Sequence, residues 1–96
     1  MQRFTDPDAE EIYTTGVSRR LPKGVARKAY RRLHLLLAAR SLQDIAVMGP
    51  IARWPRAPST YGVHVDGKWF IRFKWENLLG AFDIKLARFS PAKIQG

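Results

Sequence analysis

The chain has 96 residues, enough for one small domain with a limited core, and it contains no cysteine, which excludes disulfides and cysteine-based metal sites. It carries 17 Lys and Arg against 8 Asp and Glu, and this net charge of +9 favours a polyanionic partner such as nucleic acid, an anionic membrane or an acidic protein. No apolar run approaches the roughly 20 residues of a membrane span, and the start lacks an apolar signal core. We therefore expect a cytoplasmic protein with no membrane contact.

Helical signals dominate the first half of the chain, after a possible short edge strand at residues 2–4. Asp6 and Pro7 predict the N-cap and first position of a short helix that ends at Gly16. Pro22 opens the longest predicted helix, which runs to about Arg40 and shows apolar residues at helical spacing. A further turn of helix is predicted within residues 41–48.

The long predicted helix has a basic side, which is either a solvated surface or a groove for phosphates or an acidic partner. This side is made by Lys23, Arg27, Lys28, Arg31 and Arg32.

Residues 49–60 hold three prolines and a glycine, so we predict an irregular loop and not a strand. The loop carries Arg53, Trp54 and Arg56. Arginines interleaved with an aromatic residue suit RNA, because rings stack on bases and guanidinium groups bind phosphates. The alternative is that Trp54 anchors the loop to the core and both arginines are solvated.

Residues 61–75 predict a β-hairpin around Asp66 and Gly67. A two-residue turn at 66–67 would pair Val65 with Lys68, whereas a three-residue loop at 66–68 would pair Val65 with Trp69. We favour the three-residue loop, because it places all the apolar side chains of both strands on one face.

In that register Val63 pairs with Ile71, and the apolar face is made by Tyr61, Val63, Val65, Trp69, Ile71, Phe73 and Trp75. The opposite face carries His64, Phe70, Arg72 and Lys74, and we look for function there.

A third strand is predicted over residues 81–86, with Phe82, Ile84 and Leu86 alternating with Asp83 and Lys85. Helices followed by a meander of strands predict an α+β domain whose helices cover one sheet face. We expect a single domain over residues 1–90 and a C-terminal tail over 91–96, with no metal or cofactor site indicated by spacing.

The order of these segments resembles the RelE/HigB-type toxins of bacterial toxin–antitoxin modules, specifically the plasmid-maintenance killer subgroup. The similarity covers roughly residues 20–90, and it is carried by Leu21-Pro22-Lys23, the basic–leucine helix to Arg40, the hairpin at 61–75 and the strand at 81–86. The resemblance implies a RelE-like fold, with two N-terminal helices packed on one face of a mainly antiparallel twisted sheet.

The resemblance also implies a ribosome-dependent endoribonuclease that cuts mRNA and is neutralised by a cognate helix-turn-helix antitoxin. Lys74 falls at the family's second hairpin arginine, and Arg72 stands two residues from the first, where this chain has Phe70. The candidate catalytic residues are Arg72, Lys74 and His64. The candidate RNA-binding residues are Arg53, Trp54, Arg56, Arg88, Arg27 and Arg31.

The end of the last strand departs from the family. Members usually close it with an acidic-Tyr-His triplet, and here those positions read Arg88-Phe89-Ser90. The alternative function is therefore a toxin-fold protein that binds RNA, the ribosome or a protein target without cleaving. A structural or DNA-associated accessory domain is a third hypothesis.

Overall fold

The computed structural model of the chain describes residues 3–47, 49, 51–54, 56–57 and 59–88. The predicted tail at 91–96, with Phe89 and Ser90, lies outside these residues. The described elements are α1 (Pro7–Thr15), α2 (Lys23–Ala38), α3 (Leu42–Ala46), β1 (Ile51–Arg53), β2 (Thr60–Asp66), β3 (Trp69–Glu76) and β4 (Gly80–Arg88). The strands form one antiparallel sheet in the order β1-β2-β3-β4, so the predicted α+β class is confirmed.

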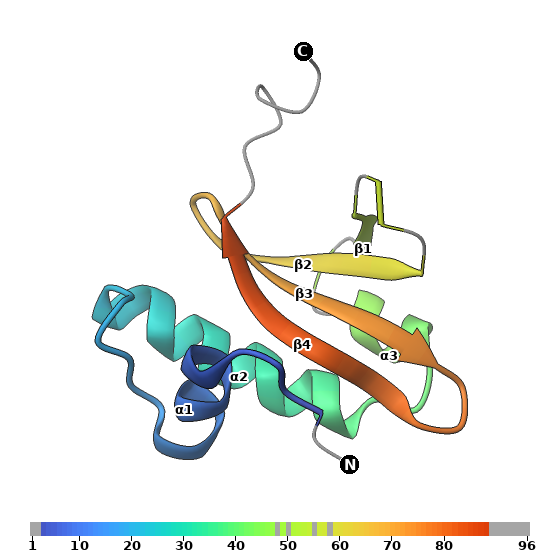
Figure 1. The fold of residues 1–96 in the computed structure, drawn as a ribbon, viewed down its shortest axis with the longest axis horizontal. Coiled ribbons are helices and arrows are strands. Elements are labelled where there is room, and N and C mark those ends of the chain that lie inside the picture. Colours follow the sequence, from blue (N-terminus) through green and yellow to red (C-terminus); the bar gives the residue numbers. More distant parts are fainter. Residues whose placement is uncertain (1–2, 48, 50, 55, 58, 89–96) are drawn as a thin grey trace.

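The two longer helices lie on one side of the sheet (Figure 1). Helix α2 contacts β2, β3 and β4, while α1 packs against α2 and β4. Between these layers the core contains fully buried Leu33, Ile71 and Phe73, and Ile45 of α3 joins it. Among the described residues, no helix has both the length and the apolar character that crossing a membrane requires.

The helix boundaries follow the sequence signals. The Asp6 carboxylate accepts a hydrogen bond from the Asp8 N–H at 3.0 Å and so caps α1. Gly16 ends α1 with a left-handed φ of 80°, and its N–H donates to the Ile12 carbonyl at 2.8 Å. Helix α2 ends at Ala38, two residues before the predicted Arg40.

In the part of the segment that the structure describes, the predicted N-terminal edge strand is reduced to a single β-bridge. Phe4 forms an isolated parallel bridge with Ile84 of β4, while Gln2 lies outside the described residues. The other Asp6 oxygen accepts a hydrogen bond from the Leu86 N–H at 3.0 Å. This N-terminal segment therefore attaches to β4.

The prediction that the whole of 49–60 is an irregular loop was wrong for its first part. Residues 51–53 form β1, in which Ile51 pairs with Val63 and Arg53 with Tyr61. None of the three prolines falls within these residues, so their N–H groups can pair with the free edge of β2.

The hairpin has the predicted faces but a different turn. Val63 pairs with Ile71 as expected, whereas Asp66 and not Val65 pairs with Trp69. Val65 is the extra residue of a β-bulge, and its side chain is buried. The bulge absorbs the odd residue, so a two-residue turn coexists with an unbroken apolar face.

A second bulge changes the faces of β4. Lys74 pairs with Phe82 and Arg72 with Lys85, which leaves one extra residue in β4. Asp83 lies at this bulge and has a left-handed φ of 51°. The predicted alternation was therefore wrong for Phe82, which shares the face of Lys74, whereas Ile84 is in the core.

Candidate functional site

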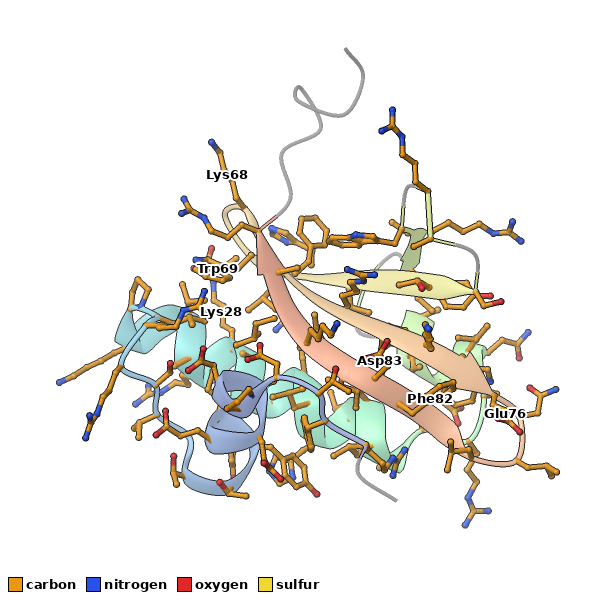
Figure 2. The ribbon with its side chains drawn as sticks, viewed as in Figure 1. Lys28, Lys68, Trp69, Glu76, Phe82 and Asp83 are labelled. Atoms are coloured by element: carbon orange, nitrogen blue, oxygen red, sulfur yellow. The ribbon has the colours of Figure 1, made fainter. Side chains whose placement is uncertain are left out.

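One face of the sheet lies away from α1 and α2 (Figure 1), and we call it the open face. By the strand register its side chains come from β2, β3 and β4: His64, Phe70, Arg72, Lys74, Phe82 and Lys85. Phe82 is labelled in Figure 2. The face assigned to the candidate catalytic residues thus exists as predicted, and the second bulge adds Phe82 to it.

Cations of the open face surround a single carboxylate, that of Asp83. Its oxygens lie 3.6 Å from the Lys74 ammonium and 3.9 Å from that of Lys85, and the Thr5 hydroxyl donates to it at 2.6 Å. The Thr5 hydrogen bond, followed by the charges of Lys85, Lys74 and Arg72, lowers the pKa of Asp83, although partial burial acts the other way. The cluster therefore holds one fixed negative charge among three positive charges.

Aromatic rings occupy the neighbouring part of the open face. The Trp54 ring lies over Gly62, where a Cβ atom would approach two of its carbons to 2.8 Å. Its centroid is 6.0 Å from that of Phe70, in an edge-to-face arrangement, and 5.8 Å from the Arg72 guanidinium carbon. Trp54 thus holds the loop against the open face, and not against the core as one of the two interpretations had supposed.

The three candidate catalytic side chains do not converge. His64 pairs with Phe70, its ring lies edge-on to that residue at 5.1 Å, and its Nε2 is 2.9 Å from the Gly67 carbonyl oxygen. Lys74 stands four residues beyond Phe70 on β3, about 13 Å along the strand. Arg72 lies between them, two residues from Phe70 and two from Lys74, so the structure separates His64 from Lys74 while Arg72 neighbours both positions along the strand.

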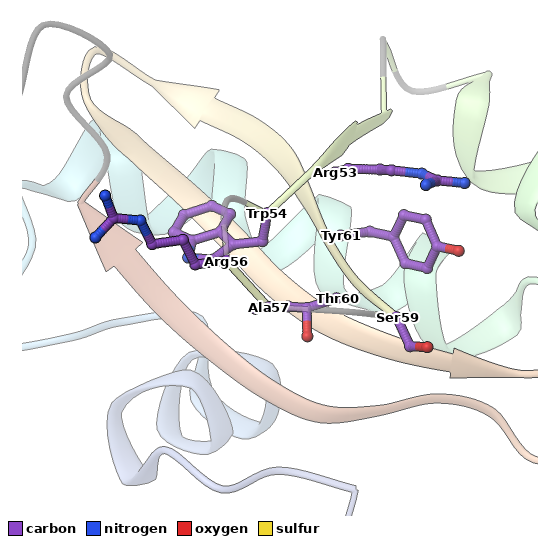
Figure 3. A pocket seen from close by; sticks show the side chains of 7 residues that line it. All are labelled: Arg53, Trp54, Arg56, Ala57, Ser59, Thr60 and Tyr61. Atoms are coloured by element: carbon purple, nitrogen blue, oxygen red, sulfur yellow. The ribbon is translucent and has the colours of Figure 1, made fainter. Parts of the chain in front are cut away.

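The remaining candidates are distributed over other surfaces. Arg53 pairs with Tyr61 on the face opposite the open face, and Arg56 extends from the loop (Figure 3). Arg88, a candidate RNA-binding residue, pairs with Trp69, and its guanidinium carbon is 5.6 Å from that ring, so it too lies on the opposite face, away from Arg72.

The basic side of α2 has two parts. Arg27 and Arg31 are exposed on the helix. In contrast, Arg32 donates from Nε to the His64 carbonyl oxygen at 2.9 Å, and the Lys28 ammonium is 3.6 Å from the Asp66 carboxylate. The second pair connects α2 to the hairpin, so Arg27 and Arg31, with the exposed Lys23, remain candidates for partner binding.

No protein-family model matches this chain, and no curated protein is significantly similar to it. Within the described ranges, no group of three or more His, Asp or Glu residues could hold a metal ion. The site must therefore be interpreted from its own side chains.

Sequence reasoning missed Phe82, Asp83 and Lys85 as members of the site. The only signal was their place in a predicted strand, and strict alternation put Phe82 in the core. The sequence does not reveal a bulge when the residue with positive φ is an aspartate, because aspartate adopts this conformation only occasionally.

Proposed function

We propose that the open face binds single-stranded RNA, and that the domain is a ribosome-dependent mRNA endoribonuclease, the toxin of a RelE/HigB-type toxin–antitoxin pair. The observation that carries this proposal is the gathering of Arg72, Lys74 and Lys85 beside the rings of Trp54 and Phe70. Proteins that bind single-stranded nucleic acid use cations to bind the phosphates of its backbone and aromatic rings to stack on its bases.

The reaction proposed is attack of an RNA 2′-oxygen on its own 3′-phosphate. The new P–O bond forms as the bond to the next nucleotide's 5′-oxygen breaks, leaving a 2′,3′-cyclic phosphate and a 5′-hydroxyl. The Arg72 guanidinium suits the phosphorane, because its planar fork can bind two oxygens. Lys74 and Lys85 would hold neighbouring phosphates as point charges, and Asp83 between them keeps their ammonium groups near one another.

The 2′-hydroxyl must lose its proton as it attacks, and the departing 5′-oxygen must gain one, so the reaction needs a group that transfers protons near the reacting phosphate. His64 is the imidazole on the open face, and it has the side-chain type best suited to proton transfer near neutral pH. Its Nε2 faces the Gly67 carbonyl, and it is separated from Lys74 by the length of four strand residues. This observation favours the second candidate function, in which the domain binds RNA or the ribosome and blocks translation without cleaving.

An antitoxin partner is part of the proposal. With a net charge of +9, the chain is suited to a partner whose contact surface is acidic. Such a partner would neutralise the domain by covering either the open face or the exposed Arg27 and Arg31 on α2.

The test is expression without any antitoxin, with growth and soluble folded protein both recorded. We expect Arg72→Ala to abolish growth inhibition and Lys74→Ala to reduce it less, whereas Lys68→Ala, at the hairpin turn, leaves it unchanged. Arg72 is half-buried against Trp54, so loss of that contact costs about 0.5–1 kcal/mol, which a stable fold tolerates.

Cleavage is measured separately, by primer extension on messages translated by purified ribosomes. Ribosome-dependent cuts that disappear in Arg72→Ala would support the endoribonuclease. Inhibited translation without cuts, unaffected by His64→Ala, would support the binding function instead. Full toxicity from a well-folded Arg72→Ala variant would contradict both uses of the open face.

A further inference from the structure

A hollow of about 550 Å³ lies beside the loop that joins β1 to β2, at one edge of the sheet (Figure 3). Its lining is made by Arg53, Trp54, Arg56, Ala57, Ser59, Thr60 and Tyr61. These residues include two arginines and two aromatic rings, and none carries a carboxylate. The size falls in the range of roughly 300–1,000 Å³ that is usual for small-ligand sites.

The walls of this hollow are held in place by the loop itself. The Trp54 N–H donates to the Thr60 carbonyl at 2.8 Å, and the Thr60 N–H donates to the Ala57 carbonyl at 3.1 Å. Arg56 and Ser59 have left-handed φ angles of 60° and 62°, which side-chain-bearing residues adopt at a conformational cost. Because these bonds shape the hollow before any ligand is present, less conformational entropy of the loop is lost when a ligand binds.

The two arginines of the hollow extend in different directions (Figure 3). Arg53 leaves the end of β1 on the side of its pairing partner Tyr61, whereas Arg56 leaves the loop on the side of Trp54. A guanidinium group binds one phosphate through two parallel hydrogen bonds. Because the two guanidinium groups point apart, they suit two separate phosphates with an aromatic base between them. One nucleotide within an RNA strand offers this arrangement, since its base lies between the phosphates on either side of its ribose.

The hollow is continuous with the open face through one residue. The Trp54 ring forms part of its wall and also lies 5.8 Å from the guanidinium carbon of Arg72. If Arg72 binds one phosphate of an RNA strand, the neighbouring nucleotides of that RNA would therefore lie at the hollow.

We infer that the hollow binds one nucleotide of a single-stranded RNA, with Arg53 and Arg56 each binding one flanking phosphate and Trp54 or Tyr61 contacting the base. The inference rests on the proposed function, since it assumes that RNA lies on the open face. It adds a nucleotide-binding subsite beside the cations that would hold the reacting phosphate.

The probe is a nucleoside 3′,5′-bisphosphate, compared with the 5′-monophosphate of the same nucleoside, and binding is measured by calorimetry and by the shifts of the tryptophan indole N–H signals. We expect the bisphosphate to bind roughly tenfold more tightly than the monophosphate, the effect of one charge-assisted hydrogen-bonded pair. Arg53→Ala and Arg56→Ala should each weaken bisphosphate binding roughly tenfold. The variant that loses the arginine of the 3′-phosphate should bind both probes equally well, whereas the variant that loses the arginine of the 5′-phosphate should bind both probes more weakly. Lys68→Ala deletes an equal charge outside the hollow and should change the affinity less than about twofold.

Two further measurements separate this inference from the proposed function. Lys74→Ala should weaken growth inhibition and leave bisphosphate affinity unchanged, because Lys74 is not part of the hollow. If Arg53→Ala and Lys68→Ala bind the bisphosphate equally well, the subsite is refuted even where Arg72→Ala has abolished toxicity. Bisphosphate binding without any binding of an RNA oligonucleotide would overturn the assignment to RNA.

Discussion

Replacing Gly62 with alanine tests how the open face is built. The added Cβ would approach two carbons of the Trp54 ring to 2.8 Å, whereas ordinary contacts begin near 3.4 Å, so the ring must move by more than half an ångström. Overpacking of this kind lowers the unfolding free energy by about 1–3 kcal/mol. Alanine also restricts the unfolded chain more than glycine does, which raises the unfolding free energy by about 0.4–1 kcal/mol. The expected net loss of unfolding free energy is about 1–2 kcal/mol.

The assay is urea unfolding followed by circular dichroism, which does not depend on the displaced indole ring. A loss of this size lowers the urea midpoint by roughly 1 M for a domain with a small m-value. Gly24→Ala is the matched control, because Gly24 lies in α2 with no atom within 4 Å of its added Cβ. It should stabilise the protein by up to about 1 kcal/mol. If Gly62→Ala proved as stable as Gly24→Ala, Trp54 would not lie on the sheet as described.

Three further outcomes are expected. Leu33→Ala should lower the unfolding free energy by about 2–5 kcal/mol, whereas Leu35→Ala, at a position that is 54% exposed, should change it by less than about 0.5 kcal/mol, as thermal melts would reveal. The pKa of Asp83 lies below its ordinary value of 3.8 in the folded state, so its stabilising effect is complete above that pH and is lost as the pH falls through the folded value. Asp83→Asn should therefore be less stable than the natural chain at neutral pH, and urea titrations should show the difference shrinking in acid; a difference independent of pH would count against the assignment. Reversing the charges of Arg27 and Arg31 should weaken antitoxin or ribosome binding most at low salt, and binding equal to the natural chain at every salt concentration would show that this helix face is only solvated.

Much of the fold could be predicted because each element carries its own local signal. The cap at Asp6, the left-handed glycine at Gly16 and the apolar alternation of β3 are short-range features, and the structure contains all three. Strand β1 was missed because three residues without a strong pattern become a strand only when the edge of β2 supplies hydrogen-bond partners.

The site could be predicted only to the level of a face. Alternation placed Arg72 and Lys74 on the open face, since period two fixes the side of every residue in an unbroken strand. It could not place Phe82, because the bulge at Asp83 shifts the faces within β4. Nor could it separate His64 from Lys74, because their distance depends on how far each stands from the turn.

The two oxygens of Asp6 bond to groups at very different distances along the chain, the Asp8 N–H two residues away and the Leu86 N–H 80 residues later. The helix cap can form as soon as residues 6–8 have left the ribosome, whereas the second bond requires closure of a very long loop. Thr5 reaches Asp83 across a similar span of 78 residues. We therefore expect the N-terminal segment to dock last, after β4 has joined the sheet, so that the contact that orders the Asp83 carboxylate among its lysines is among the last to form.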